Sequence, residues 1–272
     1  MKRYVIFTDL DGTLLDHDSY SFVPAIPALR LIEERNIPLV ICSSKTRKEI
    51  ERYRERLGNR DPFIVENGGG IFIPAGYFDP SVLYSCGLRV AVEGGYVIIT
   101  LGASYHVLRR AVCELRDEGF RITGFGDMTT AQLAAVSGLS EEEAALARTR
   151  DFDEPFLFER DAAAERELEN AVRAKGFNLT RGRFFHILGE SDKGKAVAIL
   201  VSLYRQMFGE IGTVALGDSP NDIPMLARVD FPILVKKPDG RHDPRIDVPR
   251  LIRADGIGPA GWNEALLELL AV

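Results

Sequence analysis

The chain has 272 residues, of which 46% are hydrophobic and 27% charged, a composition that supports a substantial core and excludes global disorder. Its net charge of -6 argues against a general nucleic-acid binder, which would carry a basic face. No apolar run approaches the roughly 18 residues of a membrane helix, and Cys42, Cys86 and Cys113 show no metal-binding spacing. We therefore expect a cytoplasmic monomer or homodimer with no nucleic-acid or membrane partner.

The first third of the chain alternates short apolar runs with amphipathic segments. The apolar runs at residues 4–7, 38–42 and 63–65 predict strands. Residues 25–35 and 46–57 carry apolar side chains at helical spacing and predict helices. Strands separated by helices of this length imply right-handed crossovers and a parallel sheet.

The pattern changes in the middle of the chain, where antiparallel hairpins are predicted. Residues 88–92 and 96–101 flank a Glu-Gly-Gly turn, and residues 177–180 and 183–188 flank Arg181-Gly182. Two further strands are predicted at residues 121–123 and 156–158. Helices are predicted at residues 105–118, 130–136, 140–148 and 162–175, the third with Ser140 as its N-cap. We expect residues 85–189 to form an inserted α+β domain with a mostly antiparallel sheet.

The parallel pattern returns after residue 190. Helices are predicted at residues 193–208, 222–227 and 262–270, and strands at residues 213–216 and 231–235. The predicted fold class is therefore α/β: a Rossmann-like parallel-sheet core, formed by residues 1–84 and 190–272, interrupted by the inserted α+β domain.

Acidic and hydroxyl side chains follow the predicted parallel strands at the point where each strand ends. Asp9 and Asp11 follow the first strand, Ser43 and Ser44 the second, and Asp218 the strand at residues 213–216. Ligands of open parallel sheets bind at this edge, so we expect these side chains to converge. Clustered carboxylates repel one another unless a cation lies among them, and oxygen ligands suit Mg²⁺. The sequence predicts a Mg²⁺ site suited to phosphate chemistry.

Four motifs then occur in the order that is typical of one superfamily. They are Asp9-Leu10-Asp11-Gly12-Thr13, Ser43, Lys193 within Asp192-Lys193-Gly194-Lys195, and Gly217-Asp218-x-x-Asn221-Asp222. On these motifs the chain resembles the haloacid dehalogenase superfamily of phosphatases over residues 1–80 and 190–272. The insertion resembles the large α+β cap of the Cof-type subgroup, which implies a lid that excludes water and contacts the leaving group.

The resemblance implies a role for each catalytic motif. Asp9 is expected to attack phosphorus and form an aspartyl-phosphate. Asp11 is expected to protonate the leaving oxygen and then to activate the hydrolytic water. Ser43 is expected to bind a phosphoryl oxygen, and Lys193 to balance the negative charge of nucleophile and phosphate.

The resemblance also implies a set of residues for the metal. Mg²⁺ is expected to bind to the Asp9 carboxylate, the Asp11 backbone carbonyl and Asp218. Asn221 and Asp222 are expected to support this site, Asp222 by holding the ligands rather than by binding the ion itself.

Further segments resemble the mannosyl-3-phosphoglycerate phosphatases within that subgroup. They are Ser44-Lys45-Thr46-Arg47, Glu66-Asn67-Gly68-Gly69, Gly124-Phe125-Gly126-Asp127-Met128 and the run from Arg150 to Phe156. The resemblance implies a small phosphorylated sugar-glycerate substrate, 2-O-mannosyl-3-phosphoglycerate, which is cleaved to mannosylglycerate and phosphate. Its carboxylate requires a cationic partner and its hydroxyls require polar partners. The substrate-binding candidates are Ser44, Lys45, Asn67, Arg150, Arg181 and Arg183, with Asp127 and Glu154 also available to the sugar.

Several alternatives remain open from the residues alone. The substrate could carry another sugar, as in a sucrose-phosphate-type phosphatase, or the enzyme could pass phosphate back to a sugar, as a phosphomannomutase-like phosphotransferase does. A receiver-like module phosphorylated on Asp9 is a third alternative, against which Asp11 and the inserted domain both argue. His186 lies in a predicted strand, where we expect a core histidine.

Overall fold

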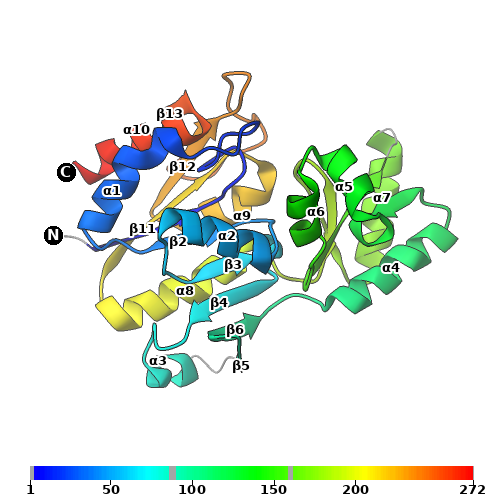
Figure 1. Cartoon of the computed structure of the whole chain (residues 1–272), viewed down its shortest axis with the longest axis horizontal. Coiled ribbons are helices and arrows are strands. Elements are labelled where there is room, and N and C mark those ends of the chain that lie inside the picture. The colour runs from blue at the N-terminus through cyan, green and yellow to red at the C-terminus, as the bar shows by residue number, and fades with distance from the viewer. Residues whose placement is uncertain (1–2, 86–89, 159–161, 272) are drawn as a thin grey trace.

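The computed structural model describes residues 3–85, 90–158 and 162–271, which form a larger and a smaller lobe (Figure 1). The larger lobe is built on a nine-stranded sheet in the order β13-β12-β11-β1-β2-β3-β4-β6-β5, and the smaller lobe on a four-stranded sheet in the order β7-β8-β10-β9. The chain crosses to the smaller lobe after β6 and returns after β10 (Figure 1). A parallel-sheet core with a separate antiparallel sheet confirms the predicted fold class. Cys86 lies outside the described residues.

The strands of the large sheet run parallel from β13 to β3 and antiparallel from β3 to β5. Central β1 pairs with β11 and β2 in such a register that its last residue, Thr8, lies opposite Leu216 and Ile41. The ends of these three strands therefore reach the same edge of the sheet. The strands are β1 (Arg3–Thr8), β2 (Leu39–Cys42), β3 (Phe63–Val65), β4 (Gly70–Pro74), β5 (Val90–Glu93), β6 (Tyr96–Thr100), β11 (Ile211–Gly217), β12 (Phe231–Lys236) and β13 (Ile252–Ile257).

Helices cover both faces of the large sheet and bury an apolar cluster on each. Trp262 is fully buried in one cluster and Tyr204 in the other. The first face is covered by α1 (Ile26–Glu34), α2 (Arg47–Leu57) and α10 (Gly258–Leu270). The second face is covered by α3 (Pro80–Ser85), α8 (Lys193–Phe208) and α9 (Ile223–Leu226). Burial of this apolar surface supplies most of the driving force for the fold.

The smaller lobe also has two layers of helices. Its strands are β7 (Ile122–Gly124), β8 (Asp153–Phe158), β9 (Asn178–Arg181) and β10 (Phe185–Leu188). The helices α4 (Tyr105–Asp117) and α7 (Ala162–Ala174) pack on one face, while α5 (Thr130–Ser137) and α6 (Glu141–Ala147) lie on the side of the larger lobe (Figure 1). Ser140 is the N-cap of α6, accepting a hydrogen bond from the Glu143 N–H at 3.2 Å, which confirms the predicted cap.

The structure differs from the sequence-based expectation in the placement of the first hairpin. We expected it within the inserted segment, residues 85–189, but β6 pairs with β4 and β5 pairs with β6, so that both strands extend the large sheet. The antiparallel sheet of the smaller lobe begins only at β7. The division of the chain at residues 84 and 189 stays a prediction. Across the described ranges, every helix is too short or too polar to cross a membrane.

Candidate active site

The strand ends of the large sheet bring together the residues of the four motifs. Asp9 directly follows β1, and its N–H donates to the carbonyl of Leu216 in β11 at 3.0 Å. Ser43 follows β2, and Asp218 follows β11. The first residue of α8, Lys193, reaches the same place, as α8 packs on one face of this sheet. The predicted convergence at the carboxyl edge of the sheet is thus what the fold produces.

Three buried carboxylates and one buried ammonium form the centre of the site. Asp9, Asp218 and Asp222 each place a carboxylate oxygen within 4.8 Å of the others. Lys193 Nζ, on a residue only 1% exposed, lies 2.6 Å from Asp9 Oδ1 and 2.7 Å from Asp222 Oδ1. The cluster therefore sets three acidic groups against one cation, and all four side chains are largely buried.

The charge imbalance is reflected in the acid–base properties of the cluster. Burial raises the pKa of Asp9 well above its ordinary value; Lys193 opposes that shift, and Asp222 and Asp218 add to it. Burial, with Asp222 beside it, raises the pKa of Asp218 to about 6. Burial lowers the pKa of Lys193, but Asp222 and Asp9 outweigh that effect, and the net shift is upward. An excess of buried oxygen donors fits a hard divalent cation such as Mg²⁺, which would favour the ionised carboxylates.

Asp222 organises the loop that carries Asp218. Its Oδ2 accepts hydrogen bonds from the N–H groups of Asp218 and Ser219, both at 3.1 Å, while its Oδ1 contacts Lys193. These contacts fit the supporting role expected for Asp222. Asn221, on the same loop, donates from Nδ2 to Asn67 Oδ1 at 3.2 Å. Ser43 is fully buried at the end of β2, and its Oγ accepts a hydrogen bond from the Lys45 N–H at 3.3 Å.

Asp11 is not one of the three clustered carboxylates and contacts Lys45 instead. Its Oδ2 lies 3.0 Å from Lys45 Nζ, and its side chain is 39% exposed. Asp11 Oδ1 is buried and has no hydrogen-bond partner within the part of the chain that the structure describes. Lys45 is also 3.7 Å from Glu49 and lies over the rings of Tyr20 and Tyr53. Lys45 therefore holds the carboxylate that is expected to act as acid and base, and its predicted contact with substrate stays a prediction.

Residues that follow β2 and β3 attach the smaller lobe to the larger one. Glu66, from the short 3₁₀ helix η2 (Glu66–Gly68), accepts hydrogen bonds from the three consecutive N–H groups of residues 151–153. Arg150 Nη1 donates to the Ser44 carbonyl at 2.8 Å and to Asp153 Oδ1 at 2.7 Å. Arg150 thus serves the contact between the lobes, and a direct contact with substrate stays a prediction.

A cavity of about 590 Å³ lies between the lobes, with Asp9, Asp11 and Asp218 in its lining. Five of the predicted substrate-binding residues line it, namely Ser44, Lys45, Arg150, Arg181 and Arg183, and so does Asn221 of the expected metal site. The lining also includes residues that the sequence-based argument missed, namely Tyr20, Phe125, Phe184, His186, Lys237 and Arg245. Lys237 follows β12, so the strand-end rule that found Asp9 would have found it too.

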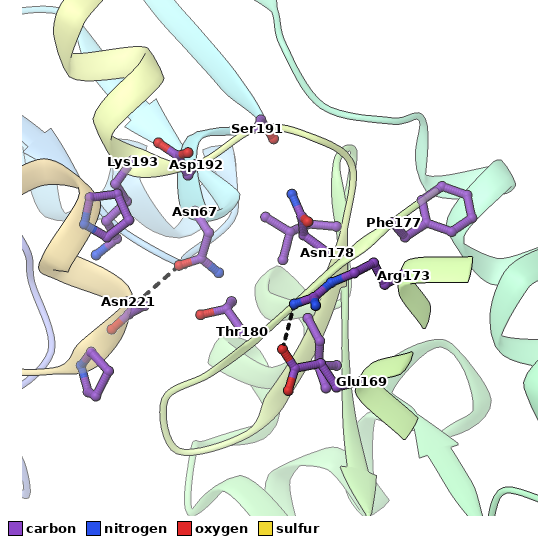
Figure 2. A pocket seen from close by; sticks show the side chains of 14 residues that line it. Asn67, Glu169, Arg173, Phe177, Asn178, Thr180, Ser191, Asp192, Lys193 and Asn221 are labelled. Atoms are coloured by element: carbon purple, nitrogen blue, oxygen red, sulfur yellow. Dashed lines mark hydrogen bonds and ion pairs between the residues drawn. The ribbon is translucent and has the colours of Figure 1, made fainter. Parts of the chain in front are cut away.

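Asn67 lies apart from this cavity, in the lining of a smaller one. That second cavity, of about 190 Å³, is shown in Figure 2, where a hydrogen bond joins the lining residues Asn67 and Asn221. Asn67 Nδ2 also donates to Asp153 Oδ2 at 3.1 Å, so both ends of its amide are engaged. Its predicted contact with the sugar stays a prediction.

The two acids considered for the sugar are both paired. Asp127 forms ion pairs with Arg109 and Arg116, and Glu154 forms one with Arg109 at 2.7 Å.

Comparisons with known proteins agree with the fold and with the motifs. The family model for haloacid dehalogenase-like hydrolases matches residues 6–83. Two solved structures share the fold: Thermoplasma acidophilum 0175, with a TM-score of 0.69 at 17% identity over 100% of both chains, and the sucrose-phosphatase of Synechocystis sp. PCC6803, with 0.63 at 14% over 98% of both.

Curated relatives are much more similar in sequence. The glucosyl-3-phosphoglycerate/mannosyl-3-phosphoglycerate phosphatase of Methanococcoides burtonii is 48% identical over 98% of this chain and 97% of its own. The protein of the same description from Persephonella marina is 44% identical, with 98% and 97% covered. The mannosyl-3-phosphoglycerate phosphatase of Pyrococcus furiosus is 38% identical, with 88% and 93% covered. The chain therefore belongs to the haloacid dehalogenase-like hydrolases and, within them, to the family of the mannosyl-3-phosphoglycerate phosphatases.

Proposed function

We propose that this protein is a Mg²⁺-dependent phosphatase that hydrolyses 2-O-mannosyl-3-phosphoglycerate to mannosylglycerate and phosphate. The main support is the buried cluster in which Lys193 contacts both Asp9 and Asp222, with Asp218 beside them and with Asp9 and Asp218 in the lining of the cavity between the lobes. The relatives' descriptions name both mannosyl and glucosyl substrates, and we propose that this chain accepts both. We also infer a cytoplasmic location, which the scattered cysteines favour.

The metal and Lys193 would prepare the nucleophile. Mg²⁺, bound by the Asp9 carboxylate, the Asp11 carbonyl and Asp218, would offset the repulsion between a carboxylate nucleophile and an anionic phosphate. Lys193 already neutralises Asp9 Oδ1, which leaves the other oxygen of Asp9 for attack. Asp222 keeps Lys193 and the Asp218 loop in place for this step.

The reaction then needs two displacements at phosphorus. Asp9 forms a bond to phosphorus while the bond to the glycerate oxygen breaks, and Asp11 gives its proton to that leaving oxygen. A water molecule then transfers a proton to Asp11 and attacks the aspartyl-phosphate, which releases orthophosphate and restores Asp9. Ser43, which is buried at the end of β2, would donate a hydrogen bond to a phosphoryl oxygen during both steps.

The carboxylate of the substrate needs a cation that is not already paired. Arg181 is 53% exposed at its side chain and forms an ion pair with Glu165 at 2.6 Å. Arg183 lies beside the Tyr20 hydroxyl and lines the cavity, and among the described residues no carboxylate comes within 4.0 Å of its guanidinium. We propose that Arg183 binds the glycerate carboxylate, since an unpaired guanidinium can form a bidentate contact with it.

The first test concerns the nucleophile and the metal. We expect wild-type protein to release orthophosphate from mannosyl-3-phosphoglycerate without a bisphosphate activator, and EDTA to abolish this until Mg²⁺ is restored. Asp9→Asn should lower kcat at least about 10³-fold while leaving the fold intact, because the two side chains have similar volume. Near-wild-type turnover in Asp9→Asn would refute the mechanism, and a strict need for a bisphosphate would indicate a phosphotransferase instead.

The second test concerns the glycerate carboxylate. Arg183→Ala should raise KM for mannosyl-3-phosphoglycerate more than KM for an aryl phosphate, which has no carboxylate. Arg181→Ala is the matched variant on the same hairpin and should change KM less, because its guanidinium is engaged by Glu165. Equal changes for both substrates in Arg183→Ala would rule out recognition of the carboxylate.

A further inference from the structure

His186 in β10 faces the active-site cavity, although the sequence predicted a core histidine. Its ring is largely buried, with 6% of the residue exposed, and Nδ1 lies 2.9 Å from Asp153 Oδ2. Within residues 3–85, 90–158 and 162–271, no group forms a hydrogen bond with Nε2 of His186. Because the two ring nitrogens lie on opposite edges of an imidazole, one edge is fixed to Asp153 and the other is available to a ligand.

Asp153 is built to hold that imidazole in one orientation. The residue is fully buried and accepts hydrogen bonds from Arg150, Asn67 and His186. Burial raises the pKa of Asp153, but the charges of Arg150 and His186 outweigh this effect. The net shift of the pKa is downward, and the carboxylate stays ionised. The ionised carboxylate accepts a hydrogen bond from Nδ1–H, which leaves Nε2 to form a hydrogen bond with a ligand hydroxyl.

Aromatic side chains lie beside His186 in the same cavity. Phe125 and Phe184 line it, with ring centroids 4.9 Å apart in an edge-to-face arrangement. Phe184 directly precedes β10, and its side chain and that of His186 both line this cavity. A pyranose offers apolar C–H groups and hydroxyls together, and apolar rings next to one oriented hydrogen-bonding group match that combination.

We propose that His186 is a specificity-determining residue that binds a hydroxyl of the substrate's sugar through Nε2, and that Asp153 is the residue that positions it. This inference rests on the proposed function, because it assigns the sugar end of the same substrate. Asp153 also accepts a hydrogen bond from the side chain of Asn67. Asn67 in turn accepts one from the side chain of Asn221, on the loop that carries Asp218. Replacing Asp153 would therefore disturb the whole site, and His186 is the residue to change.

The test compares substrates with and without the sugar. His186→Asn keeps an amide near the position of Nδ1 and removes the group at Nε2, whereas His186→Gln can place its amide near Nε2. For His186→Asn, kcat/KM should fall at least about tenfold more with mannosyl-3-phosphoglycerate than with 3-phosphoglycerate, the loss expected for one hydrogen bond to a ligand. The fall in His186→Gln should be smaller. The exposed His106→Asn on α4 is the matched control and should behave as wild type.

A measurement on the wild-type protein covers the case in which a variant does not fold. In ¹⁵N spectra of the four histidine rings, titration with mannosylglycerate should shift the Nε2 signal of His186, and titration with glycerate should not. Equal losses on both substrates, or an unshifted signal with the sugar bound, would overturn the assignment of His186 alone. Failure of wild-type protein to hydrolyse mannosyl-3-phosphoglycerate, while it still cleaves an aryl phosphate, would overturn this inference together with the proposed substrate.

Discussion

Gly12 belongs to the first motif and lies close to Asp218, one of the expected metal ligands. It has a φ of +78°, in the left-handed region, and a Cβ built on it would lie 3.0 Å from Asp218 Oδ2. Its N–H donates to the carbonyl of Leu15 at 2.9 Å, which closes the turn after β1. A glycine is required here for two reasons. The backbone conformation is unfavourable for other residues, and a Cβ would crowd the Asp218 carboxylate of the proposed metal site.

Gly12→Ala should therefore affect stability and turnover together. The left-handed conformation costs about 1–2 kcal/mol for alanine, and the added methyl group displaces Asp218, so kcat with an aryl phosphate should fall as well. Gly58→Ala is the control, because Gly58 caps α2 at a φ of +64° with open space around its Cβ. The free energy of unfolding and kcat are measured for both variants and compared with those of wild type. If Gly12→Ala retains wild-type kcat, the close approach to Asp218 has no part in the reaction.

At the scale of elements, η2 holds the start of β8 against the larger lobe. Three consecutive residues of η2 have positive φ, namely Glu66 at 48°, Asn67 at 56° and Gly68 at 93°. Two of them are not glycine, so this backbone is strained. The strain is offset by the Glu66 carboxylate, which accepts the N–H groups of residues 151–153. Burial, together with the nearby Asp153 and against the opposing charge of Arg150, raises the pKa of Glu66 to about 8.

The raised pKa predicts a pH dependence for stability. Because the pKa of Glu66 is about 8 in the folded protein and 4.5 ordinarily, the folded state binds this proton more tightly. The resulting stabilisation is complete below pH 4.5 and is lost as the pH rises toward 8. Glu66→Gln cannot titrate, so wild type should lose stability relative to this variant across that window, by up to about 1.4 kcal/mol per pH unit.

Urea unfolding at several pH values measures this difference. Glu167→Gln, at an exposed position on α7, is the control and should follow wild type at every pH. A constant difference between wild type and Glu66→Gln from pH 5 to pH 8 would contradict a raised pKa of Glu66 in the folded protein.

The elements also indicate which parts of the structure can be predicted from sequence. Apolar runs such as those of β1 and β11 and caps such as Ser140 are local signals, and the motif acids follow because strand ends share one edge. β13 escaped prediction because it is an edge strand whose first and last residues, Ile252 and Ile257, are about two-fifths exposed. The place of β5 and β6 and the orientation of His186 depend on pairing between distant segments, for which the sequence offers no local pattern.

At the scale of the whole molecule, the cavity exists because the two lobes are held in contact. Arg150 is the buried cation at that contact, bonded to the Ser44 carbonyl of the larger lobe and to Asp153 of the smaller one. Thr46 Oγ1 donates to the Leu146 carbonyl at 3.1 Å, and Arg52 forms an ion pair with Glu142 at 3.0 Å. The last pair is exposed to solvent and contributes little. The buried Arg150 should therefore determine how firmly the smaller lobe covers the site.

Arg150→Met tests this control of the lobe contact. Methionine fills much of the same space but leaves Asp153 without its closest cation, and the loss of one partner of a buried pair costs about 3–5 kcal/mol. The thermal midpoint should fall, and amides of residues 141–158 should exchange with solvent faster than those of the large sheet. The aryl phosphate should lose turnover too, because an open lobe admits water. Arg148→Met, two residues away at an exposed position, removes only a contact with Thr130 and should leave all three properties near wild type. If both variants exchange alike, Arg150 does not hold the lobes together, and the closed cavity depends on Glu66 and its three hydrogen bonds instead.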